Sequence, residues 1–191
     1  MNRKKIATTK RLILRMMEPN DVDSILQIVS DPETMTFYPA VLNRTETERY
    51  VQRNLARYHR DGLGLWVVRF KDTNEFAGIC GLVVQTVDEK REIEIGYLFL
   101  RKYWGQGLAT EAAIACRDYG FRKRGFSRLI SIIAPGNIAS RRVAEKAGMK
   151  LEKETIWQDK RVCIYAIEKK DSTQRRSGLR AKKKNALPDV R

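Results

Sequence analysis

The chain has 191 residues, of which 42% are hydrophobic and 32% are charged, and its formal net charge is +15. This composition fits one globular domain with a hydrophobic core and excludes disordered and fibrous classes of protein. No apolar run approaches the roughly 20 residues that cross a bilayer, and residues 1–10 lack the apolar stretch of a secretory signal. We therefore expect a cytoplasmic protein with no membrane partner.

Apolar periodicity and turn residues predict eleven elements along the chain. In chain order they are a strand (10–16), two helices (22–29 and 45–62), three strands (64–70, 76–85 and 91–100), a helix (105–124), a strand (127–134), a helix (138–147) and two strands (150–158 and 161–168). Thr45 and Glu48 have the spacing of a capping box at the start of the second helix. The order β-α-α-β-β-β-α-β-α-β-β predicts a mixed α/β fold in which residues 64–100 form an antiparallel meander.

The C-terminal segment 171–191 differs from the rest of the chain. It contains seven basic and two acidic residues, no aromatic residue and no periodic pattern. Such a segment cannot bury enough apolar surface to become ordered. We therefore predict a folded domain over residues 1–170 and a disordered basic tail over residues 171–191.

The cysteines and the histidine argue against metal and thiol chemistry. Cys80, Cys116 and Cys163 are odd in number and far apart, so we expect buried free thiols, no disulfide framework and no metal site. His59, the single histidine, lies in a polar stretch that is expected on a helix surface. A catalytic triad with a histidine base therefore has little support.

The most informative segment is RKYWGQGLATEA, residues 101–112, between a predicted strand and a predicted helix. Gly105 and Gly107 leave backbone amides free to point at one anion, and the helix dipole adds to this attraction. The spacing fits neither the dinucleotide-binding glycine pattern nor the phosphate loop of nucleotide-hydrolysing enzymes. The segment can hold a pyrophosphate through backbone amides, and the alternative is that its glycines only form a structural turn before a helix.

This loop resembles the acetyl-CoA pyrophosphate loop of the GNAT superfamily, R/Q-x-x-G-x-G/A, with Lys102 in the leading basic position. The tryptophan before the first glycine and ATEA after the second resemble the branch of ribosomal-protein-alanine N-acetyltransferases. Residues 9–15, 92–97 and 137–149 fit the same branch, so the resemblance spans residues 8–168. It implies a central, mostly antiparallel sheet that splays after the fourth strand and carries helices on both faces.

The resemblance implies acetyl-CoA as co-substrate and a direct transfer of its acetyl group to an acceptor amine. A carboxylate is the natural base for removing a proton from the amine. Glu92 and Glu94 lie on the strand face opposite Ile93 and Ile95, and we favour Glu94 because it precedes the point of splaying. The alternative is that both carboxylates form an ordinary polar strand face.

The family places a tyrosine seven residues after the Asn137 position, where this chain has Ala144. By resemblance to the ribosomal-protein branch, Ser140 is the substitute donor for the leaving thiolate, and Asn137 contacts the pantetheine arm. Both residues are equally suited to ordinary helix capping.

The resemblance also implies an oxyanion-stabilising backbone amide near Leu98 or Phe99. The full set of expected cofactor contacts is Leu98, Phe99, Leu100, Lys102, Trp104, Gly105, Gln106, Gly107, Leu108, Ala109 and Asn137.

The acceptor is left open between three alternatives. The branch favours the N-terminal amine of a protein such as a ribosomal protein. A small-molecule amine is the second alternative, although residues 33–58 offer only Glu33, Glu46 and Glu48 to a polycation. The third is an RNA- or ribosome-associated binding protein that uses the basic tail, although this tail lacks the aromatic residues that stack bases. We expect the chain to be a monomer or a homodimer.

Overall fold

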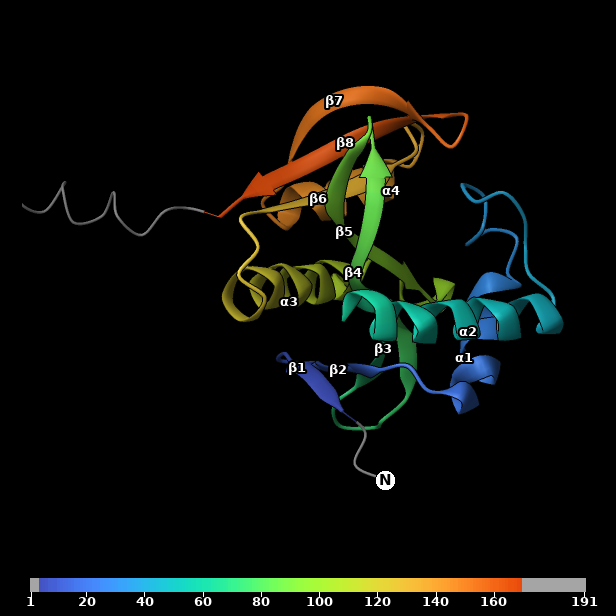
Figure 1. Cartoon of the computed structure of the whole chain (residues 1–191). Coiled ribbons are helices and arrows are strands. Elements are labelled where there is room, and N and C mark those ends of the chain that lie inside the picture. The colour runs from blue at the N-terminus through green and yellow to red at the C-terminus, as the bar shows by residue number, and fades with distance from the viewer. Residues whose placement is uncertain (1–3, 170–191) are drawn as a thin grey trace, which may run out of the picture.

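The computed structural model describes residues 4–169, which form one eight-stranded sheet with helices on both faces (Figure 1). The strands are ordered β1-β2-β3-β4-β5-β6-β8-β7 across the sheet. The elements are β1 (Lys5–Thr8), β2 (Leu12–Met16), the 3-10 helix Pro19–Asp21, α1 (Val22–Val29), α2 (Arg44–Asp61), β3 (Gly64–Phe70), β4 (Phe76–Val87), β5 (Lys90–Phe99), the 3-10 helix Arg101–Tyr103, α3 (Leu108–Lys123), β6 (Arg128–Ile133), α4 (Ile138–Lys146), β7 (Lys150–Trp157) and β8 (Lys160–Glu168). The mixed α/β fold and the antiparallel meander, here β3 to β5, are confirmed.

Strand alternation directs neighbouring side chains into two separate cores. Trp66 and Val68 of β3 pack with α3 and α4, whereas Val67 between them packs with α1 and α2. Ala112 and Ala113 of α3 are buried against the sheet. Because these side chains are small, α3 can lie close to the strands.

The sheet opens between β5 and β6. β5 pairs with β4 along its whole length, but it pairs with β6 only through Glu94 and Ile130, in parallel orientation. Beyond this pair the two strands diverge. α3 follows the carboxyl end of β5 and α4 follows that of β6, so both helices begin beside the opening. The predicted splaying after the strand at residues 91–100 is confirmed.

The predicted element order was wrong at the N-terminus because it lacked β1. Lys5–Thr8 forms an edge strand that pairs antiparallel with β2. Four residues contain too few alternating positions to be recognised as a strand from the sequence.

The predicted capping box of α2 was also wrong. Oδ1 of Asn43 accepts a hydrogen bond from the Glu46 amide (3.0 Å), and Oε2 of Glu46 accepts one from the Asn43 amide (2.8 Å). The helix therefore begins at Arg44. Asn43 with Glu46 and Thr45 with Glu48 have the same spacing, and asparagine caps a helix at least as well as threonine, so spacing alone could not distinguish them.

The predicted burial of the three cysteines and the predicted surface position of His59 are confirmed. Cys80, Cys116 and Cys163 are buried free thiols, and the sulfur atoms of Cys80 and Cys116 lie 3.2 Å apart. His59 is exposed on α2. Within residues 4–169, no helix combines the length and the apolar character needed to cross a bilayer. The tail predicted over residues 171–191 lies outside the described residues, so its boundary stays a prediction.

Candidate functional site

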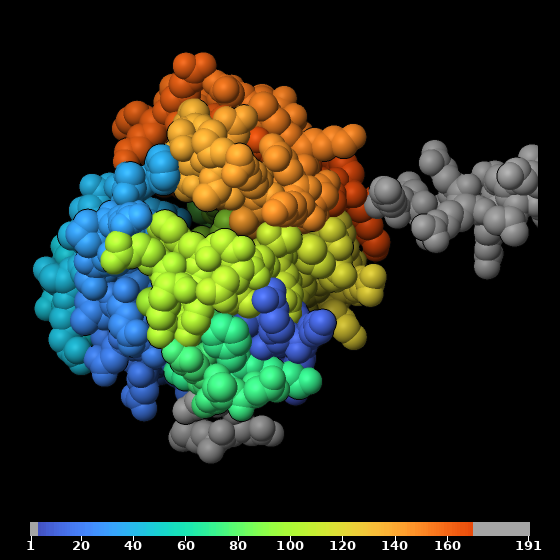
Figure 2. Space-filling view, turned by 180° about the vertical axis from the view of Figure 1, so that it is seen from behind, coloured from blue at the N-terminus to red at the C-terminus, as the bar shows by residue number. Residues whose placement is uncertain are grey.

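The opening between β5 and β6 forms a hollow on the molecular surface. Figure 2 shows this hollow between the loop that follows α1, in light blue, the start of α3, in yellow-green, and α4, in orange. The Phe37 ring lies 3.5 Å from the position that a Cβ on Gly136 would occupy, so the loop after α1 reaches the segment before α4.

The glycine loop has the backbone geometry that anion binding requires. Gly105 and Gly107 have φ angles of 76° and 75°, which favour glycine. Gly107 is the N-cap of α3, so this helix begins three residues later than predicted. Among the described residues, no hydrogen-bond acceptor pairs with the backbone amides of residues 105–110, whereas the amides of Tyr103 and Trp104 donate to carbonyls of the preceding turn. This loop can therefore hold a diphosphate through unpaired amides at a helix N-terminus.

The side chains of this loop hold its shape. Nζ of Lys102 lies 2.7 Å from Oε1 of Glu75, in an exposed ion pair on the far side of the loop. The guanidinium of Arg11 donates to the Gln106 carbonyl (3.0 Å) and to Glu111 (2.7 Å). Leu108 is buried in the core. The loop therefore presents its unpaired backbone amides beside the exposed side chains of Trp104 and Gln106.

The end of β5 offers a second backbone donor. The Leu100 amide donates to the Ala77 carbonyl, and Leu98 pairs with Ile79 two residues further along the same ladder. Successive backbone amides of β5 point alternately toward β4 and away from it. The Leu98 amide therefore points to β4, and the Phe99 amide points to the opening. Of the two amides expected to stabilise an oxyanion, the register therefore favours that of Phe99. The Phe99 carbonyl accepts a hydrogen bond from the indole of Trp104 (2.9 Å).

Glu94 lies at the closed end of the opening. Its Oε2 accepts a hydrogen bond from Nε2 of Gln85 on β4 (2.6 Å). Desolvation raises the pKa of Glu94, while the hydrogen bonds from Gln85 and from the Ile132 amide, and the charge of Arg57, act in the opposite direction. A desolvated carboxylate with a raised pKa is suited to accept a proton near neutral pH.

Glu92 has a different environment. Its carboxylate forms an ion pair with Arg128 (3.1 Å), which also binds Glu152 and Glu168. Hydrogen bonds to Glu152 and its other carboxylate partners raise the pKa of Arg128. Glu92 therefore belongs to a structural ion-pair network, and the geometry favours Glu94 as the base of the two candidates.

The charge of Glu94 acts on three tyrosines. Burial raises the pKa of Tyr50 on α2 and of Tyr97 on β5 above the ordinary tyrosine value, and the negative charge of Glu94 adds to the effect on both. Tyr38, in the loop after α1, also lies within range of this charge. These three phenols keep their protons at neutral pH.

Ser140 pairs with a tyrosine that the sequence did not single out. The Tyr97 hydroxyl lies 3.0 Å from both the carbonyl oxygen and Oγ of Ser140. A carbonyl can only accept, so when the phenolic proton points to it, the Ser140 hydroxyl donates to the Tyr97 oxygen. Ala144, where the family has a tyrosine, is fully buried in the core. Tyr97, on β5, thus supplies a hydroxyl beside α4.

Asn137 caps α4, as expected. Its Oδ1 accepts a hydrogen bond from the Ser140 amide (3.0 Å). Among residues 4–169, no acceptor binds the side-chain NH₂ group of Asn137, so this group can still donate to a ligand in the opening. Capping and ligand binding are compatible here.

Sequence reasoning missed Tyr97 and Gln85 as site residues. Tyr97 was assigned only to the apolar face of its strand, and Gln85 was the last residue of a predicted strand. The strand register that places Gln85 opposite Glu92, next to Glu94, depends on the two-residue turn at Asp88 and Glu89, both with positive φ. Recognising that turn as a tight hairpin would have placed Gln85 beside Glu94.

Comparison with known proteins shows the family of this chain. Residues 11–150 match the family model of the acetyltransferase (GNAT) domain. The chain is 40% identical to the protein YkkB of Bacillus subtilis over 166 residues, which cover 86% of this chain and 96% of YkkB.

Two solved structures share the fold. The GNAT-family acetyltransferase of Bacillus anthracis has a TM-score of 0.72 and 28% identity, and covers 84% of this chain and 96% of its own. The ribosomal-protein alpha-N-acetyltransferase RimL, solved in complex with coenzyme A, has a TM-score of 0.71 and 21% identity, covering 86% and 98%. At this identity RimL supports the fold alone.

Proposed function

The chain belongs to the GNAT acetyltransferase family, whose enzymes use acetyl-CoA, and from this premise we propose that it acetylates the N-terminal amine of a protein. One observation carries the proposal: a desolvated carboxylate, Glu94, lies at the closed end of the opening whose other end presents the unpaired amides of residues 105–110. The first group suits proton removal from an amine, and the second suits a diphosphate.

We assign the donor side mainly to backbone groups. Acetyl-CoA supplies an activated acetyl group as a thioester. The amides of residues 105–110 would hold its diphosphate, and the side-chain NH₂ of Asn137 would donate to its pantetheine arm. The Phe99 amide would donate to the oxygen that becomes negative during transfer.

On the acceptor side we assign proton transfer to two side chains. Glu94 would take a proton from the ammonium group of the acceptor, directly or through water, so that the nitrogen lone pair can attack. As the carbon–nitrogen bond forms and the carbon–sulfur bond breaks, the nitrogen releases its second proton to water, and the hydroxyl of Ser140 would donate to the departing sulfur. Tyr97 lies 3.0 Å from this hydroxyl and would donate its phenolic hydrogen to Ser140 Oγ, which leaves the Ser140 hydrogen for the sulfur, so Tyr97 is a positioning residue.

The protein-amine acceptor is supported by two observations. The loop sequence around Trp104 and Gly105 resembles that of ribosomal-protein acetyltransferases. The mouth of the opening is also rimmed by exposed apolar side chains suited to a peptide, namely Phe37, Tyr38, Val41 and Ile138.

A thiol-release assay with acetyl-CoA tests this function. The acceptors are short peptides with free α-amines, the same peptides with blocked α-amines, and small amines including a polyamine, an aminoglycoside and free amino acids. We expect turnover with free peptides and a mass increase of one acetyl group on the α-amine. Turnover confined to small amines would refute the proposed acceptor. Coenzyme A binding without turnover on any amine would contradict the assigned proton-transfer groups.

A further inference from the structure

A polar groove of about 750 Å³ lies next to Glu94, on the side away from the glycine loop. Three distant segments form it: the end of α2, the β4–β5 hairpin and the β7–β8 hairpin. Its lining residues are Arg60, Asp61, Val84, Gln85, Thr86, Arg91, Trp157 and Gln158. Gln85 joins this groove to the site already described, because its side-chain amide donates to Glu94. The indole of Trp157 donates to the Thr86 carbonyl (2.9 Å) and so fixes the β7–β8 hairpin against β4.

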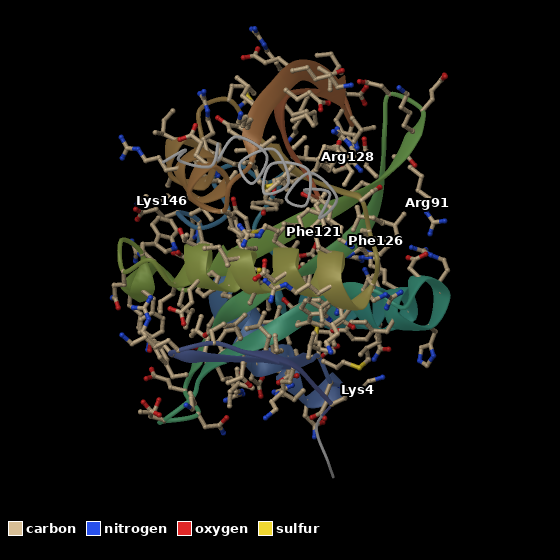
Figure 3. The ribbon with its side chains drawn as sticks, turned by 90° about the vertical axis from the view of Figure 1, so that its left-hand side faces the viewer. Lys4, Arg91, Phe121, Phe126, Arg128 and Lys146 are labelled. Carbon is tan, nitrogen blue, oxygen red and sulfur yellow. The ribbon has the colours of Figure 1, made fainter. Side chains whose placement is uncertain are left out.

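The rim of the groove is positively charged. Arg60 forms an ion pair with Asp61 (2.7 Å). The charges of Arg91 and Arg57 also act on Asp61, and together with the Arg60 hydrogen bond they lower its pKa. Figure 3 shows Arg91 extending from the β4–β5 hairpin toward the end of α2. Three arginines therefore surround one aspartate.

Two of these arginines have no carboxylate of their own. Arg57 and Arg91 form no ion pair with any residue between 4 and 169. Arg57 is half-buried on α2, and its charge also acts on Glu94. A half-buried guanidinium without a partner is well placed to bind an incoming carboxylate, because that contact adds charge-assisted hydrogen bonds and little new desolvation.

We propose that this groove binds the acceptor segment behind the reacting amine, and that Arg57 and Arg91 select peptides with acidic residues at their second to fourth positions. This inference rests on the proposed function. The site is negative at its inner end, at Glu94, and positive at the rim. An acceptor that is cationic at its α-amine and anionic a few residues later matches this order of charges.

The same order of charges disfavours polycationic acceptors. A polyamine or an aminoglycoside would place its further amino groups against Arg60 and Arg91 and near the charge of Arg57, and among the described residues that line the groove Asp61 alone is acidic. A free amino acid carries a carboxylate directly beside its amine. With the amine at Glu94, this carboxylate cannot reach the arginines at the rim, because Gln85 lies between Glu94 and the groove. The groove therefore fits an extended acidic peptide.

The test compares three peptides of equal length that share the same first residue and carry two acidic, two neutral or two basic residues at positions two and three. kcat/KM is measured by thiol release with the intact protein, with R57Q, with R91E, and with Arg122→Gln as the control. Arg122 is an exposed arginine on α3 that does not line the groove, and its loss changes net charge as R57Q does. Free aspartate and glutamate are included as small carboxylate-bearing amines.

We expect the intact protein to favour the acidic over the neutral peptide by about tenfold, the effect of one charge-assisted hydrogen bond. R57Q should reduce this ratio toward one, with Arg91 keeping part of the preference, R91E should invert it, and Arg122→Gln should leave it unchanged. The preference should weaken at 0.5 M salt, where exposed charges are screened.

Equal kcat/KM for the three peptides, or the same loss of preference in Arg122→Gln, would overturn the inference while leaving N-terminal acetylation intact. Free aspartate or glutamate exceeding every peptide would overturn it in favour of a small acceptor. Absence of turnover on any peptide would instead refute the proposed function. The inference is then tested separately by calorimetry, which compares the Kd of the acidic peptide for the intact protein with its Kd for the R57Q variant. Circular dichroism of each variant excludes loss of the fold.

Discussion

The two ends of the β5–β6 opening present different kinds of chemical group. At the donor end, a contiguous loop presents backbone amides whose direction depends on two glycines with left-handed φ. At the acceptor end, Glu94, Gln85 and Arg57 come from three separate elements and contribute side chains. The donor end should therefore tolerate side-chain changes and be sensitive to backbone changes, whereas the acceptor end should depend on single functional groups.

The largest expected effect is that of Glu94→Gln, which keeps the shape of the side chain and removes the base. We expect kcat/KM to fall by about 10² to 10⁴, the usual contribution of general base catalysis. In the intact protein the rate should decline as pH falls through the Glu94 pKa, which desolvation raises. This acidic limb should be missing from the pH–rate profile of the variant.

Glu92→Gln is the matched control, since it removes an equivalent carboxylate two residues away. It loses the ion pair with Arg128 and should lower stability slightly while leaving the acidic limb in place. The folded state holds the Glu94 proton more tightly than the unfolded state does, so the Glu94 contribution to stability decreases as pH rises through its folded pKa. Glu94→Gln should therefore raise Tm at neutral pH, and an unchanged or lower Tm would contradict the desolvation of this carboxylate.

Ser140→Ala should have the next largest effect, a fall in kcat of about ten- to a hundredfold from the loss of one hydrogen-bond donor. KM for acetyl-CoA should change little. Because Tyr97 acts through Ser140, Tyr97→Phe should add little to Ser140→Ala in the double variant. Steady-state kinetics of both single variants and the double variant measure this coupling, and additive effects would show that the two hydroxyls act independently.

Gly107→Ala tests the donor end through its backbone. An alanine at φ 75° costs about 1 to 2 kcal/mol, although the added Cβ would meet only the Arg11 side chain, at 3.8 Å. We expect Kd for coenzyme A, measured by calorimetry, to rise by about tenfold with kcat nearly unchanged. An unaltered Kd would mean that these amides do not contact the diphosphate.

Lys102→Ala should have the smallest effect, although the sequence placed this residue in the leading basic position of the motif. Its ammonium group pairs with Glu75, and an exposed pair contributes roughly 0 to 1 kcal/mol. We expect Kd for coenzyme A to change by less than about threefold. A tenfold weakening would show that Lys102 leaves Glu75 to bind the ligand and that side chains matter at the donor end too.

The same comparison explains what the sequence could predict. The glycine loop was predictable because its function depends on consecutive residues and on backbone conformation, which Gly105 and Gly107 encode locally. Most of the fold was predictable from periodicity for a similar reason, apart from the four-residue strand β1. The pairs Tyr97 with Ser140 and Lys102 with Glu75 were not predictable, because their members lie 43 and 27 residues apart and meet only through tertiary packing.

The single parallel pair between Glu94 and Ile130 divides the sheet into β1–β5 and β6–β8. The two parts are joined by this ladder contact, the Arg128 network and the hydrogen bonds from Ser131 to the Ile95 carbonyl and from Trp157 to the Thr86 carbonyl. Such a seam should separate at a lower free energy than global unfolding, and amides of β6 and β8 should then exchange hydrogen faster than those of β3 and β4. A nucleotide that spans both sub-sheets would close the seam by mass action. The susceptibility of this enzyme to proteases would accordingly follow the supply of its acetyl donor.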